Sequence, residues 1–157
     1  IGTSKSDVPQ QIFLGTLAQS AVVVLASLIG GRLSDWTGRR KIFVFTASLV
    51  YGLAMFAVAV ATNFNGFLVG MAISGLGFGM YVAVDLALVA DVLPKRDDVA
   101  KDLGVFNIAG ALPFSIAPAL APVILLMGRG SYGVLYAFAG ICAIIGAVAI
   151  LRVRGVR

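Results

Sequence analysis

Five long runs of apolar residues, separated by short polar segments, dominate the hydrophobic pattern of this sequence. The runs cover about residues 8–31, 42–62, 64–93, 103–127 and 133–153, and each approaches or exceeds the roughly 20 residues that a helix needs to cross a bilayer. The strict alternation of apolar and polar residues that is typical of membrane β-strands is absent from these runs. Because unpaired backbone groups are costly in lipid, the pattern predicts five transmembrane α-helices.

Composition favours a membrane protein over a soluble domain. Of the 157 residues, 60% are hydrophobic and 12% are charged, whereas about 25% of the residues of an ordinary soluble domain are charged. The net charge is +5, but the basic residues lie at the ends of apolar runs and not among aromatic residues on a polar surface. Nucleic acid is therefore not an expected partner. The expected fold is all-α, a polytopic helix bundle in the lipid bilayer.

The distribution of basic residues predicts how the chain is oriented in the membrane. Ten of the 12 Lys and Arg residues lie after the first run, after the third run or in the carboxyl-terminal tail, and the other two, Lys5 and Arg129, lie on the opposite side. Positively charged loops remain in the cytoplasm. We therefore expect a multi-pass protein of the plasma (inner) membrane, with its amino-terminal end outside and its carboxyl-terminal end in the cytoplasm.

The residue types that are missing exclude several kinds of chemistry. The sequence has no histidine and no glutamate, and its single cysteine, Cys142, lies inside an apolar run. A histidine-based metal site and a Ser-His-Asp triad are therefore excluded, and so is an internal disulfide. No Gly-Lys phosphate-binding loop is present, so the sequence does not indicate direct use of ATP. We expect no enzyme activity, no cofactor and no metal.

The polar segment GRLSDWTGRRK, residues 31–41, carries a motif. It has the order G-x-L-x-D-x-x-G-R-R, formed by Gly31, Leu33, Asp35, Gly38, Arg39 and Arg40. This order resembles the signature loop of the major facilitator superfamily, which joins the second and third helices of each six-helix half. An ordinary positively charged cytoplasmic loop is the alternative, but both glycines and the aspartate would then occur by chance.

The glycines and the charged residues of the motif have physical roles that the pattern predicts. Gly31 would let two helix ends approach closely, and Gly38 would allow a tight turn. Asp35 would pair with Arg39 or Arg40, or face the positive end of a neighbouring helix.

The resemblance covers most of the chain. Residues 93–122 are similar, though less specifically, to a segment of bacterial members of the superfamily, in particular the sugar:cation symporter-like branch. The resemblance implies that the five runs are helices eight to twelve of twelve, so that residues 1–157 form most of the carboxyl-terminal half. Because the sequence begins at Ile1, we expect a fragment whose amino-terminal half is a missing partner, since alternating access requires two halves.

Polar residues inside the first run form a stripe that the second and fifth runs lack. Thr16, Ser20 and Ser27 fall within about 40° of one another on a helix, and Gln19 is a further polar residue of this run. The resemblance implies that helix eight faces partner helices and the transport cavity, whereas helices nine and twelve face lipid. The stripe agrees with that assignment, although such residues also serve in helix packing.

Asp85 is the most informative single residue, because it lies inside the third run, about 12 Å from its cytoplasmic end. An acidic side chain at such depth costs about 2.5–3.5 kcal/mol and is by default a functional candidate. One interpretation is a site that binds a coupling proton or cation, with Ser74 and Tyr81 on the same helical face. The alternative is a structural aspartate that bonds a neighbouring helix or closes an inner gate.

The fourth run contains one polar candidate and three prolines. Asn107 lies about one turn inside this run, where it would help to close an inner gate or form a helix–helix hydrogen bond. Pro113, Pro118 and Pro122 should kink or interrupt the helix. Such breaks often line transporter cavities.

Taken with the resemblance, these features predict a secondary active carrier that moves a small solute by alternating access, coupled to a proton or cation. Sugar-type symport and drug-type efflux both remain open at this stage. The alternative is a non-transporting multi-span scaffold or assembly subunit.

Overall fold

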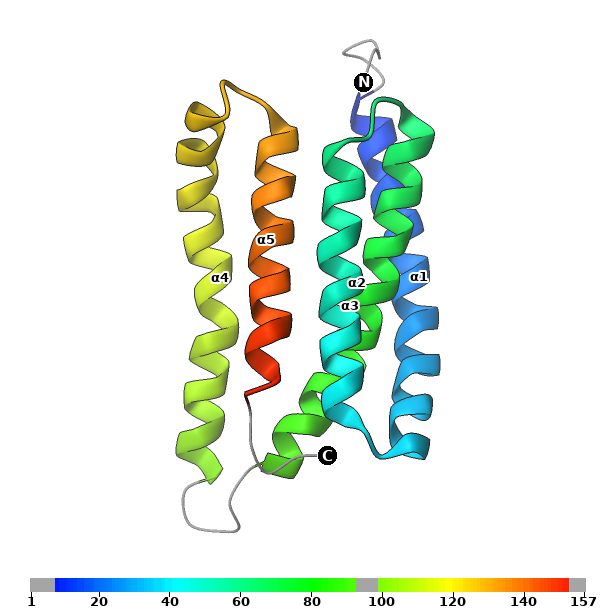
Figure 1. Cartoon of the computed structure of the whole chain (residues 1–157), viewed down its shortest axis with the longest axis vertical. Helices are drawn as coiled ribbons and strands as arrows, with labels where there is room; N and C mark the ends of the chain where they lie inside the picture. Colours follow the sequence, from blue (N-terminus) through cyan, green and yellow to red (C-terminus); the bar gives the residue numbers. More distant parts are fainter. Residues whose placement is uncertain (1–7, 93–98, 153–157) are drawn as a thin grey trace.

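The structure, a computed structural model, describes residues 8–92 and 99–152, which form five α-helices that run alternately up and down (Figure 1). These are α1 (Val8–Thr37), α2 (Arg40–Ala59), α3 (Phe64–Val92), α4 (Val99–Met127) and α5 (Tyr132–Ile150). All five are long and apolar enough to cross a membrane. The predicted all-α membrane bundle is therefore confirmed for the described part of the chain.

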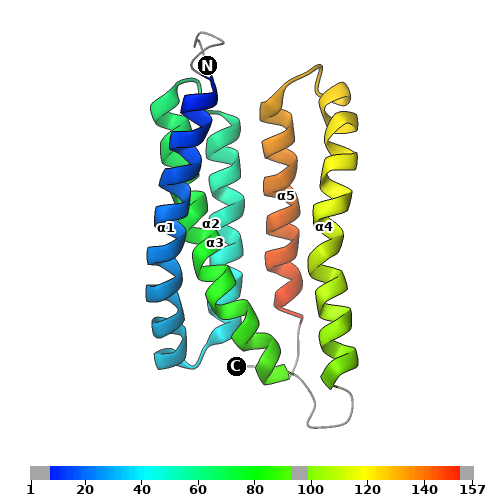
Figure 2. The ribbon, with the colours of Figure 1, turned by 180° about the vertical axis from the view of Figure 1, so that it is seen from behind.

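The helices form a group of three and a pair. Helix α3 packs along both α1 and α2, and the other side of α2 packs against α5. Helix α4 makes only slight contact with α5 and none with the other described helices. Figure 2, seen from behind, shows the same order, with α4 at one edge and α1 at the other. The pair α4–α5 is therefore held to the rest of the bundle through α2.

Glycines allow the helices of the group to touch through their backbones. A Cβ atom added at Gly77 would lie 2.6 Å from the backbone nitrogen of Tyr51 in α2, and one at Gly79 would lie 2.5 Å from the carbonyl oxygen of Val23 in α1. No larger side chain fits at such distances without moving a helix. Small residues are the usual means by which helices associate in lipid, where the hydrophobic effect does not drive them together.

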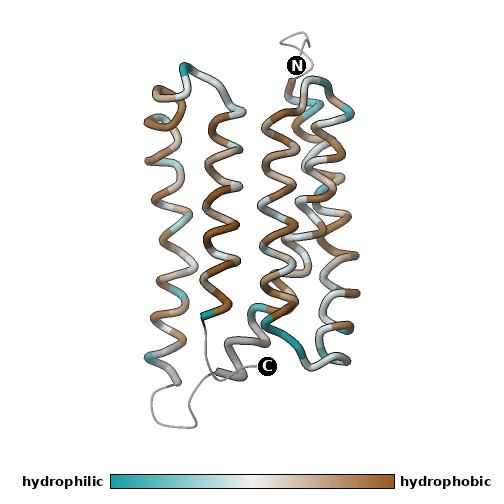
Figure 3. The backbone as a smooth tube through the Cα atoms, viewed as in Figure 1, coloured by the Kyte–Doolittle hydropathy of each residue, from teal (hydrophilic) through white to brown (hydrophobic). Residues whose placement is uncertain are grey.

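Hydrophobic residues recur along the whole length of each helix (Figure 3), and many of their large side chains are exposed. Large hydrophobic side chains such as Phe114, which is 84% exposed, project from the helices and are not covered by other described residues. The side chains buried inside are mostly small, as Ala47 and Ala54 are. This distribution is that of a protein whose outer face contacts lipid.

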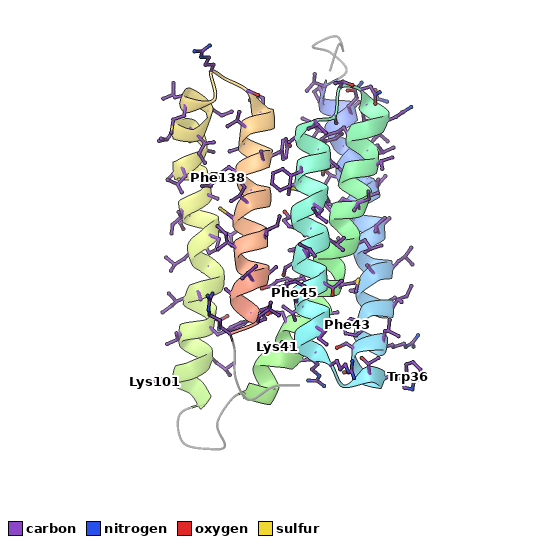
Figure 4. All side chains as sticks on the ribbon, viewed as in Figure 1. Trp36, Lys41, Phe43, Phe45, Lys101 and Phe138 are labelled. Atoms are coloured by element: carbon purple, nitrogen blue, oxygen red, sulfur yellow. The ribbon has the colours of Figure 1, made fainter. Side chains whose placement is uncertain are left out.

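Charged residues gather at one end of the bundle, which we call the basic end. It is the end at which α1 finishes, α2 begins, α4 begins and α5 finishes, and its described Lys and Arg residues are Arg32, Arg39, Arg40, Lys41, Lys101 and Arg152. Trp36 also lies there, is 84% exposed and points out of the bundle, as an anchor in the membrane interface would (Figure 4). Arg129 lies in the α4–α5 connection at the opposite end.

Some helix bounds differ from those that hydropathy predicts. Helix α1 continues six residues beyond position 31 to Thr37, so that Gly38 and Arg39 alone join it to α2. Polar residues do not stop a helix where it leaves the bilayer, because its hydrogen bonds are internal to the segment. Helix α4 likewise begins at Val99, before position 103, and α5 ends at Ile150, before position 153.

Candidate functional site

The turn between α1 and α2 is formed by Gly38. Its N–H donates to the carbonyl oxygen of Ser34 over 2.9 Å, which closes the last turn of α1. Its φ of 63° lies in the left-handed region, and no atom lies within 4 Å of where a Cβ would be. Helices often end on a glycine of this conformation, because a glycine adopts it without steric cost. The motif glycine therefore sets where α1 stops and α2 starts.

Arg40 connects three helices at the basic end. From the first position of α2, its Nη2 donates to Oδ1 of Asp35 in α1 over 3.2 Å, and its Nη1 donates to the carbonyl oxygen of Ala87 in α3 over 2.7 Å. The planar guanidinium suits such a forked arrangement, which a lysine could not reproduce. Of the two pairings that the sequence allowed for Asp35, the structure contains the one with Arg40, whereas Arg39 is exposed.

Lys41, the next residue of α2, reaches in another direction. Its Nζ donates to the carbonyl oxygen of Leu151, at the end of α5, over 2.7 Å. The last carbonyls of a helix carry partial negative charge and lack helical donors, so a lysine there is favourable. Figure 4 labels Lys41 at the basic end, between α2 and α5. Neither the Lys41 contact nor the contact of Arg40 with Ala87 could be predicted from the motif, since their partners are distant in sequence.

The close approach of α1 to α3 near the motif occurs one residue before the expected position. A Cβ at Gly30 would lie 3.0 Å from Cγ of Met80, whereas one at Gly31 would meet Cβ of Ala83 at an ordinary 3.6 Å. Ser34, 2% exposed, is buried in this region, and its Oγ has no hydrogen-bond partner among the described residues. Leu33, another motif residue, is exposed. The sequence pattern singled out neither Gly30 nor Ser34.

Asp85 and Tyr81 lie in α3 close to the signature loop. Both are half-buried, and the Tyr81 and Asp85 side chains neighbour one another, one helical turn apart. Tyr81 packs against a small buried cluster of Val44 from α2 and Val84 from α3. The Ala87 carbonyl that binds Arg40 lies two residues beyond Asp85. The acidic candidate and the signature loop therefore belong to one region of the basic end.

Ser74 and Gln19 form a separate polar contact between α3 and α1. Gln19 Nε2 donates to Oγ of Ser74 over 3.1 Å, and the Ser74 hydroxyl donates to the carbonyl oxygen of Met71 over 2.7 Å. Ser74 is fully buried. Ser74 therefore contacts α1, while Tyr81 lies further along α3 beside the cluster of Val44 and Val84.

The remaining candidates face outward. Asn107 is exposed on α4, and α4 has no contact with α3, so the structure does not bring Asn107 to Asp85. Thr16 and Ser20 of the polar stripe on α1 are also exposed, and the Thr16 hydroxyl donates to the carbonyl oxygen of Ile12 in its own helix over 2.9 Å.

Comparison with known proteins agrees with the motif. Residues 3–157 match the sequence profile of the Major Facilitator Superfamily. The chain is 30% identical over 89 residues to the "Probable polyol transporter 4" of Arabidopsis thaliana, covering 57% of this chain and 16% of that protein. It is 27% identical over 147 residues to the "Multidrug resistance protein MdtL" of Klebsiella pneumoniae, covering 94% of this chain and 37% of that protein.

The name of a third relative refers to another solute. The chain is 36% identical over 74 residues to the "Niacin transporter NiaP" of Acinetobacter baylyi, covering 47% of this chain and 17% of that protein. In each of these three comparisons the match spans at most 37% of the relative's length.

Proposed function

Because this chain belongs to the major facilitator superfamily, we propose that it is part of a secondary active transporter that carries a small solute across the plasma (inner) membrane. The match over residues 3–157 is the observation that carries the proposal. We place the five helices as helices eight to twelve of a twelve-helix carrier. The missing amino-terminal half is then the partner with which this part alternates access to the two sides.

The carrier's coupling site is Asp85. A carboxylate inside a transmembrane helix is expensive to retain without a function, and here it is half-buried with the Tyr81 hydroxyl as its neighbour. Such a group can bind and release a proton or a monovalent cation. Its position beside the loop that Arg40 ties to α3 supports a link between ion binding and movement of the basic end.

The other candidates have supporting roles. Gln19 and Ser74 hold α1 against α3 through their hydrogen bond. Asn107 and the exposed stripe of α1 face the partner half or the cavity between the halves.

Sugar-type symport and drug-type efflux are the two candidate modes of transport. The relatives' names refer to polyols, drugs and niacin, which supports both sugar-type symport and drug-type efflux. No described residue favours the alternative of a non-transporting scaffold.

The basic end faces the cytoplasm in this proposal, as the positive-inside rule requires. The test uses single cysteines in place of Arg39 and Arg129, in a Cys142→Ala background and in the complete carrier. A membrane-impermeant maleimide added outside intact cells should label the position of Arg129 and not that of Arg39. Labelling of both positions from the same side would contradict the topology.

The functional test is solute transport by the complete carrier in proteoliposomes. Radiolabelled polyols, niacin and a lipophilic cationic drug are each supplied with and without an imposed proton or sodium gradient. We expect one class to accumulate against its gradient, and Asp85→Asn to abolish that accumulation while leaving solute exchange. Gly146→Ala, at an exposed position of α5 where nothing lies within 4 Å of the added Cβ, is the control. Gradient-driven accumulation by Asp85→Asn would remove the coupling role, and a folded wild-type carrier that moves no solute would remove the function.

A further inference from the structure

The first turns of α2 connect the end of α5 to the part of α3 that carries Asp85. Arg40 and Lys41 are adjacent in sequence, and adjacent side chains of an α-helix point about 100° apart. Arg40 donates to the carbonyl oxygen of Ala87 in α3, whereas Lys41 donates to the carbonyl oxygen of Leu151 at the end of α5. Two consecutive residues of α2 therefore bind two different helices.

A hydrophobic contact accompanies these two hydrogen bonds. Val44, one turn after Arg40, forms a buried pair with Val84 of α3, and their side chains are 3% and 1% exposed. Ile150, the last residue of α5, packs against this pair. The end of α5 is therefore attached to the first turns of α2 by both a hydrogen bond and an apolar side chain.

The contacts that α2 makes with α3 lie on both sides of Asp85. In the described part of the chain, α5 packs against α2 and α4 but not along α3, so its end acts on α3 through α2 and the valine pair. Val84 lies one residue before Asp85, and Ala87 lies two residues after it. Tyr81 packs against the same valine pair. The position of the Asp85 carboxylate therefore depends on where the first turns of α2 are held.

An ion-binding carboxylate functions only while its surroundings hold it in place, to within about 0.5 Å. The side chain of Tyr81 neighbours Asp85, but both residues belong to α3. Their contact cannot fix α3 relative to the rest of the bundle. Arg40 and Val44 of α2 do so, and α2 is itself held from its other side by the end of α5.

We propose that the carboxyl-terminal end of α5 positions the coupling site, with Lys41 and Ile150 as the positioning residues. While both contacts are made, α2 holds α3 so that Asp85 binds the coupling ion before the carrier changes conformation. When either contact is lost, this part of α3 loosens and the carrier moves solute without the ion. The proposal rests on the proposed function, in which Asp85 binds that ion.

The first test separates coupling from solute movement. The complete carrier is reconstituted in proteoliposomes as the wild type, Lys41→Met or Ile150→Ala. Two rates are measured for whichever radiolabelled polyol, niacin or cationic drug the carrier transports: accumulation under an imposed proton or sodium gradient, and exchange without a gradient. We expect each substitution to lower the ratio of accumulation to exchange about 5-fold or more, while the KM of exchange is unchanged. Lys41→Arg, which keeps a charged donor, should restore part of the ratio.

Two matched controls accompany these variants. Ile145→Ala shortens an isoleucine of α5 that is 63% exposed, and Arg152→Met removes a positive charge from an exposed residue at the same end of α5. Both should keep the wild-type ratio. If Lys41→Met and Ile150→Ala lowered accumulation and exchange by the same factor, the contacts would only stabilise the fold, and the proposal would be wrong. An equal fall of the ratio in Arg152→Met would assign the effect to net charge and would also overturn it.

The second test does not depend on transport. Hydrogen exchange, read by mass spectrometry in the complete carrier, reports local opening of the backbone. We expect the amides of residues 81–87 to exchange faster in Lys41→Met and Ile150→Ala than in the wild type or in Ile145→Ala. The amides of residues 66–75, toward the other end of α3, should not change.

The two tests together distinguish failure of this proposal from failure of the proposed function. Unchanged exchange at residues 81–87 in both variants would show that the end of α5 does not hold this part of α3, and would overturn the proposal even if Asp85 couples transport. Faster exchange there, together with gradient-driven accumulation by Asp85→Asn, would show that α5 holds α3 but that Asp85 is not the coupling site. In that case the proposed function would fail, and the positioning role with it.

Discussion

The Nη1 atom of Arg40 lies 2.7 Å from the carbonyl oxygen of Ala87, a residue 47 positions further along the chain. The same guanidinium also contacts Asp35 in α1. A short motif at the α1–α2 turn therefore fixes the basic end of α3, the helix that carries Asp85. The contact gives the signature loop a structural task that its net charge alone does not explain.

Replacement of Arg40 should destabilise the bundle more than replacement of its acidic partner. A hydrogen bond from a charged group to a buried carbonyl contributes about 1.5–3 kcal/mol, whereas an exposed ion pair contributes about 0–1 kcal/mol. We expect Arg40→Ala to cost more unfolding free energy than Asp35→Asn, and Arg40→Lys to recover part of the loss. Steric-trapping measurements in bicelles report these values. The control is Arg39→Ala at the exposed neighbouring position; if its cost matched that of Arg40→Ala, the Ala87 contact would have no energetic role.

The hydrogen bond between Gln19 and Ser74 should contribute modestly. Such bonds between membrane helices average about 0.6 kcal/mol, with a maximum of about 1.7 kcal/mol. We therefore expect Ser74→Ala to shift the unfolding free energy by less than Ser74→Leu, which overpacks a fully buried site and costs about 1–3 kcal/mol. A double-mutant cycle with Gln19→Leu isolates the pair. Additive effects of the two single substitutions would show that the bond is not formed.

Gly77 should not tolerate even a methyl group. Its added Cβ would lie 2.6 Å from a backbone nitrogen of α2 and 2.8 Å from the carbonyl oxygen of Ala47, so Gly77→Ala must separate α2 from α3. Overpacking of this kind costs about 1–3 kcal/mol. Gly146→Ala in α5, where nothing lies within 4 Å of the added atom, is the matched control and should be neutral or stabilising. Thermal unfolding in mild detergent compares the two, and equal midpoints would argue against the close contact.

Substitutions at Gly38 should change stability according to the backbone conformation that the new residue adopts, and not according to the size of its side chain. Because space around it is open but φ is 63°, Gly38→Ala should cost about 1–2 kcal/mol through left-handed strain. Gly38→Asn should cost less, because asparagine adopts this conformation more readily. Unfolding midpoints of both variants are compared with that of Gly104→Ala, a helical glycine with equally open surroundings. A Gly38→Ala protein as stable as the Asn variant would rule out the strain.

Hydropathy was sufficient to predict the five helices, because the length and polarity of a membrane span are imposed by the bilayer. It could not predict which helices pack together. In a soluble helix the apolar stripe marks the packed face, but here both packed and lipid-facing sides are apolar. Nothing in the sequence of α4, for example, indicates that among the described helices it touches α5 alone.

The candidate site could be predicted in part. Gly38, Asp35 and Arg40 stood out by their spacing, and their local geometry follows from that spacing. The partners of Arg40 and Lys41 are backbone carbonyls, which every residue possesses, so no side-chain pattern marks Ala87 or Leu151. Gln19 and Ser74 were each recognisable as polar residues in apolar runs, but their contact depends on how α1 crosses α3.

The bond from Lys41 to Leu151 has a consequence for biogenesis. Its partners are 110 residues apart, and a second contact, of Gly52 with Gly140, also joins α2 to α5. As the chain leaves the ribosome, α1, α2 and α3 can assemble as soon as the third span has inserted, whereas one side of α2 stays bare until residue 151 has been made. Helix α2 therefore enters the membrane early but completes its contacts with the described helices only when α5 has been made.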